Sequence, residues 1–192
     1  MLNKKRLSDK FLIYETNHAI SVLEHCFTTQ MKDIVQIMDE FVLSKKDILT
    51  KGGGKSLVSK RVDSFLYNRG WVEKEFDVRI SVDGKEKEIP THKVDCFKNR
   101  VALEVEWNNK EPFYDRDLNN FRLLHQLDAI SVGVIFTRAT ELQAIFKKLG
   151  KGDSYGPSTT HHGKLLPKLK SGGAGGCPVL VIAIKPSCYK EK

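Results

Sequence analysis

The chain has 192 residues, of which 40% are hydrophobic and 29% are charged. At roughly 150 residues per domain, this length predicts one compact domain that buries a full core. No stretch approaches the roughly 20 apolar residues of a membrane span, and the ordinary composition argues against collagen, coiled-coil, disordered and disulfide-rich secreted proteins.

The charge balance favours an anionic partner. Lys and Arg number 32 against 24 Asp and Glu, which gives a net charge of +8, and nucleic acid is the commonest polyanion that a basic surface binds. A merely basic surface would also explain this charge. The N-terminus lacks the apolar core of a secretory signal, and the cysteines are far apart with no CxxC pair. We therefore expect reduced thiols and a cytoplasmic protein.

The first third of the chain is predicted to be helical. Residues 16–43 carry apolar side chains at steps of three and four, which indicates one long amphipathic helix. The segment TKGGGKS, residues 50–56, lacks the first glycine of a phosphate-binding P-loop, because Leu49 stands there. We therefore expect a linker and no nucleotide cofactor. Ser56 is predicted to cap a second helix, which Gly70 ends.

The middle of the chain is predicted to form strands. After Trp71, apolar and polar residues alternate as far as Val82, and Asp83-Gly84 is typical of a hairpin turn. Residues 86–98 and 101–107 are expected to form two more strands.

The last third is predicted to alternate helices with buried strands. Asp115 is expected to cap one helix, and Thr140 with Gln143 to form a capping box for a short helix that ends at Gly150. Residues 151–176 are expected to be mostly loop.

Two nearly continuous apolar runs, residues 129–137 and 179–184, predict strands that are buried on both faces. The complete order of elements predicts an α/β fold in which a mixed five-stranded sheet is flanked by helices.

Three acidic residues are predicted to converge on one strand pair. If Asn99-Arg100 is a two-residue hairpin turn, Asp95 lies opposite Glu104, with Cβ atoms about 5 Å apart. Glu106 follows two residues later and therefore lies on the same face. The opposite face is then an apolar core face that holds Val94, Cys96, Val101, Leu103, Val105 and Trp107.

Crowded carboxylates raise one another's pKa or recruit a cation. Mg²⁺ prefers oxygen ligands, so we expect Asp95 and Glu104 to bind it, with the backbone carbonyl of Val105 as a further ligand. The metal would activate a water for attack on a phosphodiester, and Glu106 would accept or orient its proton. A solvated polar strand face is the simpler alternative. A glycosidase with paired carboxylates is a third, which the positive charge and few aromatic residues disfavour.

Asp95 with Glu104-Val105-Glu106, in this order of elements, resembles the PD-(D/E)XK nuclease core. The run ALEVEWNNKEPFYDRDLNNFR, residues 102–122, together with AISVGVIFTR, residues 129–138, is similar to the BglII/BstYI group of type II restriction endonucleases. The resemblance implies a homodimer that hydrolyses double-stranded DNA with Mg²⁺ at a short palindrome centred on GATC. Another PD-(D/E)XK nuclease, from repair or a mobile element, and a non-catalytic DNA-binding protein are the alternatives.

Two positions depart from the superfamily signature. Val94 stands where the signature has Pro, and Glu106 stands where most members have Lys; BglII-like enzymes have Gln there and the BamHI-like branch has Glu. We therefore expect water activation mainly by the metal, with Glu106 assisting and Lys110 as a candidate source of positive charge. Glu73 and Glu75 are candidate extra ligands, although a solvated turn is the simpler interpretation.

The resemblance predicts one nuclease domain over residues 1–192. It has an N-terminal helical part, residues 1–49, and a catalytic core, residues 50–192, with a DNA-binding loop at residues 151–176. No membrane partner is expected.

Two polar segments are expected to contact DNA. Side chains suited to base edges follow the second acidic strand: Asn108, Asn109, Lys110, Arg116 and Asn119. A long loop of the kind that is usually functional supplies Lys151, Ser154, Tyr155, Thr159, Thr160, His161, His162 and Lys164. For each residue, a helix cap or a phosphate contact is the alternative. The pair His161-His162 has no cysteine at ligand spacing and is a poor zinc site.

Overall fold

The computed structural model describes residues 8–50 and 54–191. The strands of its main sheet are β1 (Phe11–Thr16), β3 (Val72–Lys74), β6 (Val94–Lys98), β7 (Val101–Glu106), β8 (Val132–Arg138) and β9 (Val179–Ile184). The helices are α2 (Ala19–Cys26), α3 (Thr28–Glu40), α4 (Lys45–Leu49), α5 (Leu57–Tyr67), α6 (Phe113–Gln126), α7 (Gln143–Lys148) and α8 (His162–Lys170). Two short pairs stand apart from the main sheet: β2 (Leu43–Ser44) with β10 (Tyr189–Lys190), and β4 (Val78–Val82) with β5 (Lys85–Ile89).

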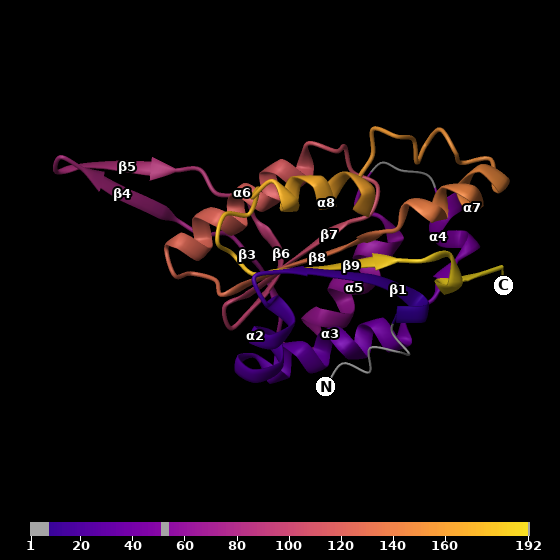
Figure 1. Ribbon diagram of the computed structural model, residues 1–192, viewed down its shortest axis with the longest axis horizontal. Helices are drawn as coiled ribbons and strands as arrows, with labels where there is room; N and C mark the ends of the chain where they lie inside the picture. Colours follow the sequence, from indigo (N-terminus) through magenta and orange to yellow (C-terminus); the bar gives the residue numbers. More distant parts are fainter. Residues whose placement is uncertain (1–7, 51–53, 192) are drawn as a thin grey trace.

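The main sheet is mixed and has the order β1-β9-β8-β7-β6-β3 (Figure 1). The central strands β7, β8 and β9 are parallel, and the outer strands pair antiparallel. The predicted α/β fold with a mixed sheet and flanking helices is therefore confirmed, with six strands in place of five.

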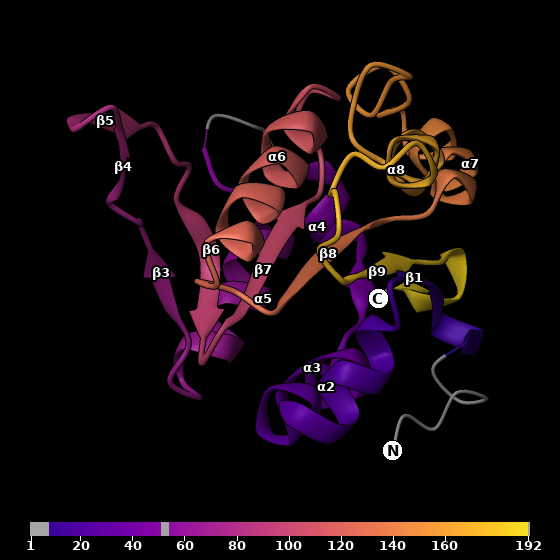
Figure 2. The ribbon, with the colours of Figure 1, turned by 60° about the vertical axis from the view of Figure 1, so that its left-hand side comes forward.

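Helices cover both faces of this sheet. Helices α2, α3 and α5 lie on one face and α6 and α8 on the other (Figures 1 and 2). Each layer encloses its own apolar core, and the core beneath α6 and α8 is the smaller of the two. The acidic strand pair β6–β7 is thus enclosed between two helical layers, so the surroundings of its side chains depend on the helix that covers each face.

The predicted long helix over residues 16–43 is wrong. The chain first forms β1, which pairs with β9, and then two helices separated by Phe27, whose φ of −128° and ψ of 49° are not helical. The apolar spacing continues across this break because α2 and α3 bury their apolar side chains in the same core. Ile20 and Leu23 of α2 lie there with Met31 and Ile34 of α3.

The predicted single strand over residues 86–98 is also wrong. Pro90 separates β5 from β6, and a proline cannot donate to a sheet ladder. β4 and β5 instead form a hairpin of their own, which projects from the body (Figure 1). Its turn at Asp83-Gly84 is confirmed, since both residues have positive φ.

Two predicted helix caps are wrong. α6 begins at Phe113, and Asp115 lies inside its first turn, where it accepts hydrogen bonds from Lys168 of α8 at 2.8 Å. Thr140 opens a 3₁₀ turn (Thr140–Leu142) without a side-chain cap, and the Gln143 amide donates to Gly152 O. No capping box is present at this turn.

Helix α8 falls within residues 151–176, which were expected to be mostly loop. Pro167 lies inside it, and a proline usually argues against a helix because it removes a backbone donor.

Several other expectations are confirmed. The Ser56 hydroxyl accepts from Ser59 N at 3.0 Å and caps α5, and Gly70 has a φ of +81° after the helix ends. The rest of the predicted linker includes residues 51–53, which lie outside the described residues. β8 and β9 are buried throughout. All four cysteines are free.

The described parts of the chain contain no helix that is long and apolar enough to cross a membrane.

Gly133 in β8 sets the distance between the sheet and α6. A Cβ atom at this position would lie 2.3 Å from the ring of Phe121, which projects from α6. The absence of a side chain therefore lets α6 pack closely over β7 and β8, and this approach brings residues of α6 to the acidic strand pair.

Candidate active site

The turn between β6 and β7 positions two of the predicted acids. Asn99 and Arg100 have φ values of 44° and 67°, as a two-residue hairpin turn requires. The predicted register follows, with Cys96 opposite Leu103, Phe97 opposite Ala102 and Lys98 opposite Val101. Beyond it, Asp95 N donates to Glu104 Oε2 at 3.3 Å, and Val105 N donates to Asp95 Oδ2 at 3.1 Å. Asp95 and Glu104 therefore lie against each other's strand.

One residue of the predicted core face is misplaced. Val94 packs with Ala102 in the smaller core, beneath α6, whereas the other five belong to the larger core. The register of β3 on β6 shifts between the pairs Val72–Phe97 and Lys74–Val94, and this irregularity breaks the alternation of side chains at Val94.

Asp95 is partly exposed and has a cation beside it. Its side chain is 26% exposed, and Lys55 Nζ lies 3.2 Å from Asp95 Oδ1 while also pairing with the buried Asp63. Burial opposes the charge of Lys55, but hydrogen bonds and charge attraction from Asp63 and Asp95 outweigh it and raise the pKa of the lysine. Lys55 therefore stays protonated and places its charge between Asp63 and Asp95.

The other acids are buried beneath α6. The exposed fractions are 1% for Glu104, 2% for Glu106 and 0% for Asp117 of α6. Burial, followed by the charge of Asp117, raises the pKa of Glu104 and raises that of Glu106 to about 9. Burial raises the pKa of Asp117 to about 6, against the opposing charge of Arg116. Without a cation, Glu106 therefore retains its proton near neutral pH, whereas Asp117 is mostly ionised above about pH 6.

Glu106 and Asp117 each have a polar neighbour that orients them. Asn109 Nδ2 donates to Glu106 Oε2 at 3.0 Å. Arg116 donates from Nε and Nη2 to Asp117 Oδ1 at 3.2 and 3.0 Å, and its Nη2 lies 3.9 Å from Glu106 Oε1. A single guanidinium therefore faces two buried carboxyl groups.

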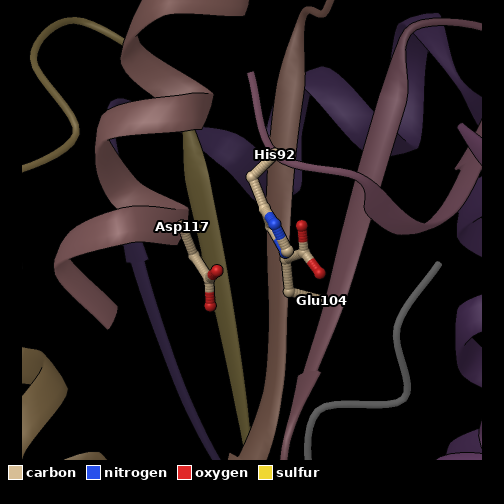
Figure 3. Close-up of side chains that lie close together, drawn as sticks. All are labelled: His92, Glu104 and Asp117. Atoms are coloured by element: carbon tan, nitrogen blue, oxygen red, sulfur yellow. The ribbon is translucent and has the colours of Figure 1, made fainter. Parts of the chain in front are cut away.

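A histidine completes a group of three potential metal ligands. His92, Glu104 and Asp117 each offer one ligand atom, and these atoms lie within 4.8 Å of one another. Figure 3 shows His92 and Asp117 beside Glu104 on its strand, with Asp117 projecting from α6. Asn120 of α6 holds the backbone of His92 by a hydrogen bond to its carbonyl at 3.0 Å. Burial, and then the charge of Arg116, lower the pKa of His92, which favours the neutral imidazole.

The three predicted acids share a strand pair, but their carboxyl groups have different neighbours. Asp95 faces Lys55, Glu104 faces His92 and Asp117, and Glu106 faces Asn109 and Arg116.

A cleft of about 710 Å³ opens beside Asp95. It brings together many of the predicted site residues: Asp95, Val105, Glu106, Asn108, Asn109, Arg116, Lys151, Ser154 and Tyr155. Lys55 and His92 also line it. Predicted residues from two distant segments, the one after β7 and the one after α7, therefore meet at a single cleft.

Some predicted DNA contacts are occupied in packing the loop. Tyr155 is 5% exposed, its hydroxyl accepts from Trp107 Nε1 at 3.1 Å, and its ring stacks on Phe146 at 4.1 Å. Thr159 Oγ1 accepts from Arg138 at 2.7 Å. These side chains support the loop from within.

Other predicted contacts lie outside the residues that line the cleft: Lys110, Asn119, Thr159, His161, His162 and Lys164. The backbone of Lys110 forms a bridge with Thr159, while its side chain is exposed.

The paired histidines anchor the start of α8. Nδ1 of His161 and of His162 lies 3.2 and 3.3 Å from Thr140 Oγ1. The described residues place no third metal ligand beside them.

The candidate ligands before β6 lie at the surface. Glu73 and Glu75 face Lys93 at 3.7 and 3.8 Å, with side chains more than half exposed. Glu73 and Glu75 are therefore better interpreted as part of a solvated turn than as metal ligands.

Sequence reasoning missed Lys55, His92 and Asp117. One signal was available for Asp117, because it lies on the buried side of α6 with Tyr114 and Phe121, and an acid on a buried helix face requires a partner. Lys55 lies in a segment interpreted as a linker, and His92 in a segment interpreted as strand. Their roles depend on tertiary packing.

A comparison with family models assigns the chain. The model described as restriction endonuclease BglII/BglIII matches residues 11–184, while no curated protein matches the chain. The match runs from β1 to the end of β9 and therefore includes the acidic strand pair, the cleft and α6. The chain belongs to the BglII/BglIII restriction endonuclease family, whose fold is that of the PD-(D/E)XK nucleases.

Proposed function

We propose that this protein is a type II restriction endonuclease that hydrolyses double-stranded DNA at a short palindromic site and requires Mg²⁺. The observation that carries the proposal is the position of Asp95 and Glu104, which lie together on β6 and β7 beside a cleft, in a chain of this family. A GATC-centred site is the finer proposal that family membership suggests.

The residues fit a hard divalent cation. Glu104 Oε1 is buried and has no hydrogen-bond partner among the described residues, and an unpaired buried carboxylate oxygen is costly. A cation held by Asp95 and Glu104, with the carbonyl of Val105 as a further proposed ligand, removes that cost. When bound, Mg²⁺ supplies positive charge to the phosphodiester and acidifies the attacking water.

The remaining groups supply charge and handle the proton. Lys55 contributes a permanent positive charge at Asp95. In most of the superfamily a lysine at the position of Glu106 supplies this charge, which a glutamate cannot do. Glu106, which Asn109 orients by a hydrogen bond, accepts the proton of the attacking water. Because its pKa is about 9 without a cation, it acts as a base only when nearby positive charge lowers that value.

Amide and basic groups along the cleft would contact the DNA. Asn108, Asn109, Arg116, Lys151 and Ser154 line it and have side chains suited to base edges and phosphates. Lys110, Asn119, His161, His162 and Lys164 are proposed contacts outside the cleft.

We treat residues 1–192 as one nuclease domain whose segment 151–176 binds DNA. Two copies would match the two-fold symmetry of a palindrome, and together they would carry 2 × 8 = +16 for neutralising phosphates.

Incubation of supercoiled plasmid with the purified protein and Mg²⁺ tests this function, with EDTA as the control. We expect discrete fragments whose sequenced ends share one palindrome, and no cleavage in EDTA. A smear of fragments would overturn site specificity and favour a repair-type nuclease. Intact plasmid, with DNA still bound, would overturn catalysis and favour a non-catalytic DNA-binding protein.

A further inference from the structure

A group of potential ligands beneath α6 shares only Glu104 with the proposed catalytic cation. Of its three members, Glu104 comes from β7, Asp117 from α6 and His92 from the segment before β6. Their ligand atoms lie within 4.8 Å of one another, and Asp95 is not a member of the group. One cation could therefore contact all three residues on the side of Glu104 that faces α6.

The hydrogen bonds of this group indicate that it is incomplete without a ligand. Glu104 Oε1 and Asp117 Oδ2 are both buried and receive no hydrogen bond from a described N–H group, while a protonated Glu106 shares its proton with the Asp117 carboxylate. The other oxygen of each carboxylate is engaged, by Asp95 N and by Arg116 respectively. Buried polar atoms normally have partners, and Glu104 Oε1 lacks one even when Glu106 is protonated, so this oxygen points to a missing cation.

The charge and the access of this group also suit a cation. Glu104, Glu106 and Asp117 place three carboxyl groups against one guanidinium, that of Arg116. His92 is half-buried and lines the cleft, so an ion can reach the group from solvent. Asn120 fixes the backbone of His92 to α6, which holds the imidazole in place before any ion arrives.

We propose that His92, Glu104 and Asp117 form a second cation site, which binds a divalent transition metal such as Co²⁺ or Mn²⁺. An imidazole nitrogen with two carboxylates suits such ions better than Mg²⁺, which prefers oxygen ligands. The site shares Glu104 with the proposed Mg²⁺ position at Asp95, but its occupation does not depend on DNA cleavage.

Titration of tag-free, chelator-treated protein with Co²⁺, followed by visible absorption and calorimetry, tests the site without DNA. We expect one saturable Co²⁺ with ligand-field absorption in the wild type. His92→Ala and Asp117→Asn should each weaken binding at least about tenfold, since even loss of a group that supports a ligand costs that much. Asp95→Asn should weaken binding less than either of these variants, and His25→Ala, at an exposed histidine of α2, should change the affinity less than about twofold.

Three results would overturn the proposal. They are the absence of saturable Co²⁺ absorption in the wild type, wild-type affinity in His92→Ala, or an equal loss of affinity in Asp95→Asn, which would place the ion at Asp95. Thermal melts check that each variant folds, and the half-buried His92 carries the test if Asp117→Asn does not. Plasmid cleavage is measured separately, so failure of the proposed nuclease activity would leave the Co²⁺ result intact.

Discussion

Acids of one strand pair occupy two contrasting environments. Asp95 is partly open to the cleft and pairs with Lys55, whereas Glu104 and Glu106 are buried beneath α6, where Arg116 is the guanidinium that faces Glu106 and Asp117. Within the described residues, Lys55 faces two carboxyl groups in the first environment and Arg116 faces two in the second, so the two environments differ mainly in their exposure to the cleft. The hairpin turn thus brings the acids close, but the elements packed around them determine which carboxyl groups retain protons or recruit a cation.

Among the variants that distinguish these two environments, removing the cation beside Asp95 should have the largest effect. We expect Lys55→Met to slow cleavage about 100-fold, because a preorganised charge at the reacting centre is lost. Lys55→Arg should retain part of the activity. Asp63→Asn is the control, since it removes the other partner of Lys55 and leaves the contact with Asp95. Single-turnover cleavage at saturating Mg²⁺ measures the effect, and a wild-type rate in Lys55→Met would eliminate this role.

Moving α6 away from the sheet should destabilise the layer that buries the acids. Gly133→Ala places a methyl group against the ring of Phe121, so we expect a loss of about 1–3 kcal/mol in the free energy of unfolding. Gly176→Ala is the matched control, because a Cβ atom there meets nothing within 4 Å. Urea unfolding measures both variants, and equal stabilities would contradict the close approach of α6.

The buried acids should make the cation-free protein less stable as pH rises. The folded-state pKa of Glu106, about 9, exceeds its ordinary value of 4.5, so the folded state binds more protons than the unfolded state between these values. Stability is therefore lost as pH rises through this window. Thermal melts in EDTA should show a Tm that falls by several degrees, and Glu106→Gln should flatten the slope. A slope that is unchanged in this variant would show that other groups cause it.

The smallest effect is expected at Lys110, whose side chain is exposed beside the cleft. Lys110→Ala should weaken DNA binding a few-fold and reduce the salt dependence of binding by about one ion, as loss of one phosphate contact predicts. Lys32→Ala, on the outer surface of α3, should change neither. Fluorescence anisotropy across a salt series compares them, and identical salt slopes would exclude Lys110 from the interface.

Local sequence signals predicted the strand pair that carries Asp95 and Glu104. The turn at Asn99-Arg100 and the alternation along both strands specify the register, and these are interactions between near neighbours in the chain. The buried strands β8 and β9 were equally predictable from the sequence, because uninterrupted apolar residues indicate a strand covered on both faces.

Features that depend on distant packing were not predicted. β1 was not predicted because its apolar residues adjoin a helical pattern. α8 was not predicted because Pro167 argued against a helix. Lys55 reaches Asp95 across 40 residues of sequence, and Asp117 reaches Glu104 only because Gly133 admits α6. Such contacts arise from the relative placement of whole elements.

The central claim is that Asp95 and Glu104 bind the catalytic cation, and parallel measurements of cleavage and DNA affinity on Asp95→Asn and Glu104→Gln test it most directly. We expect cleavage of the cognate site to fall at least about 100-fold, because several kcal/mol of charge stabilisation are lost. DNA affinity should stay the same or increase, since a negative charge near phosphate is removed. Full cleavage by either variant would contradict the account.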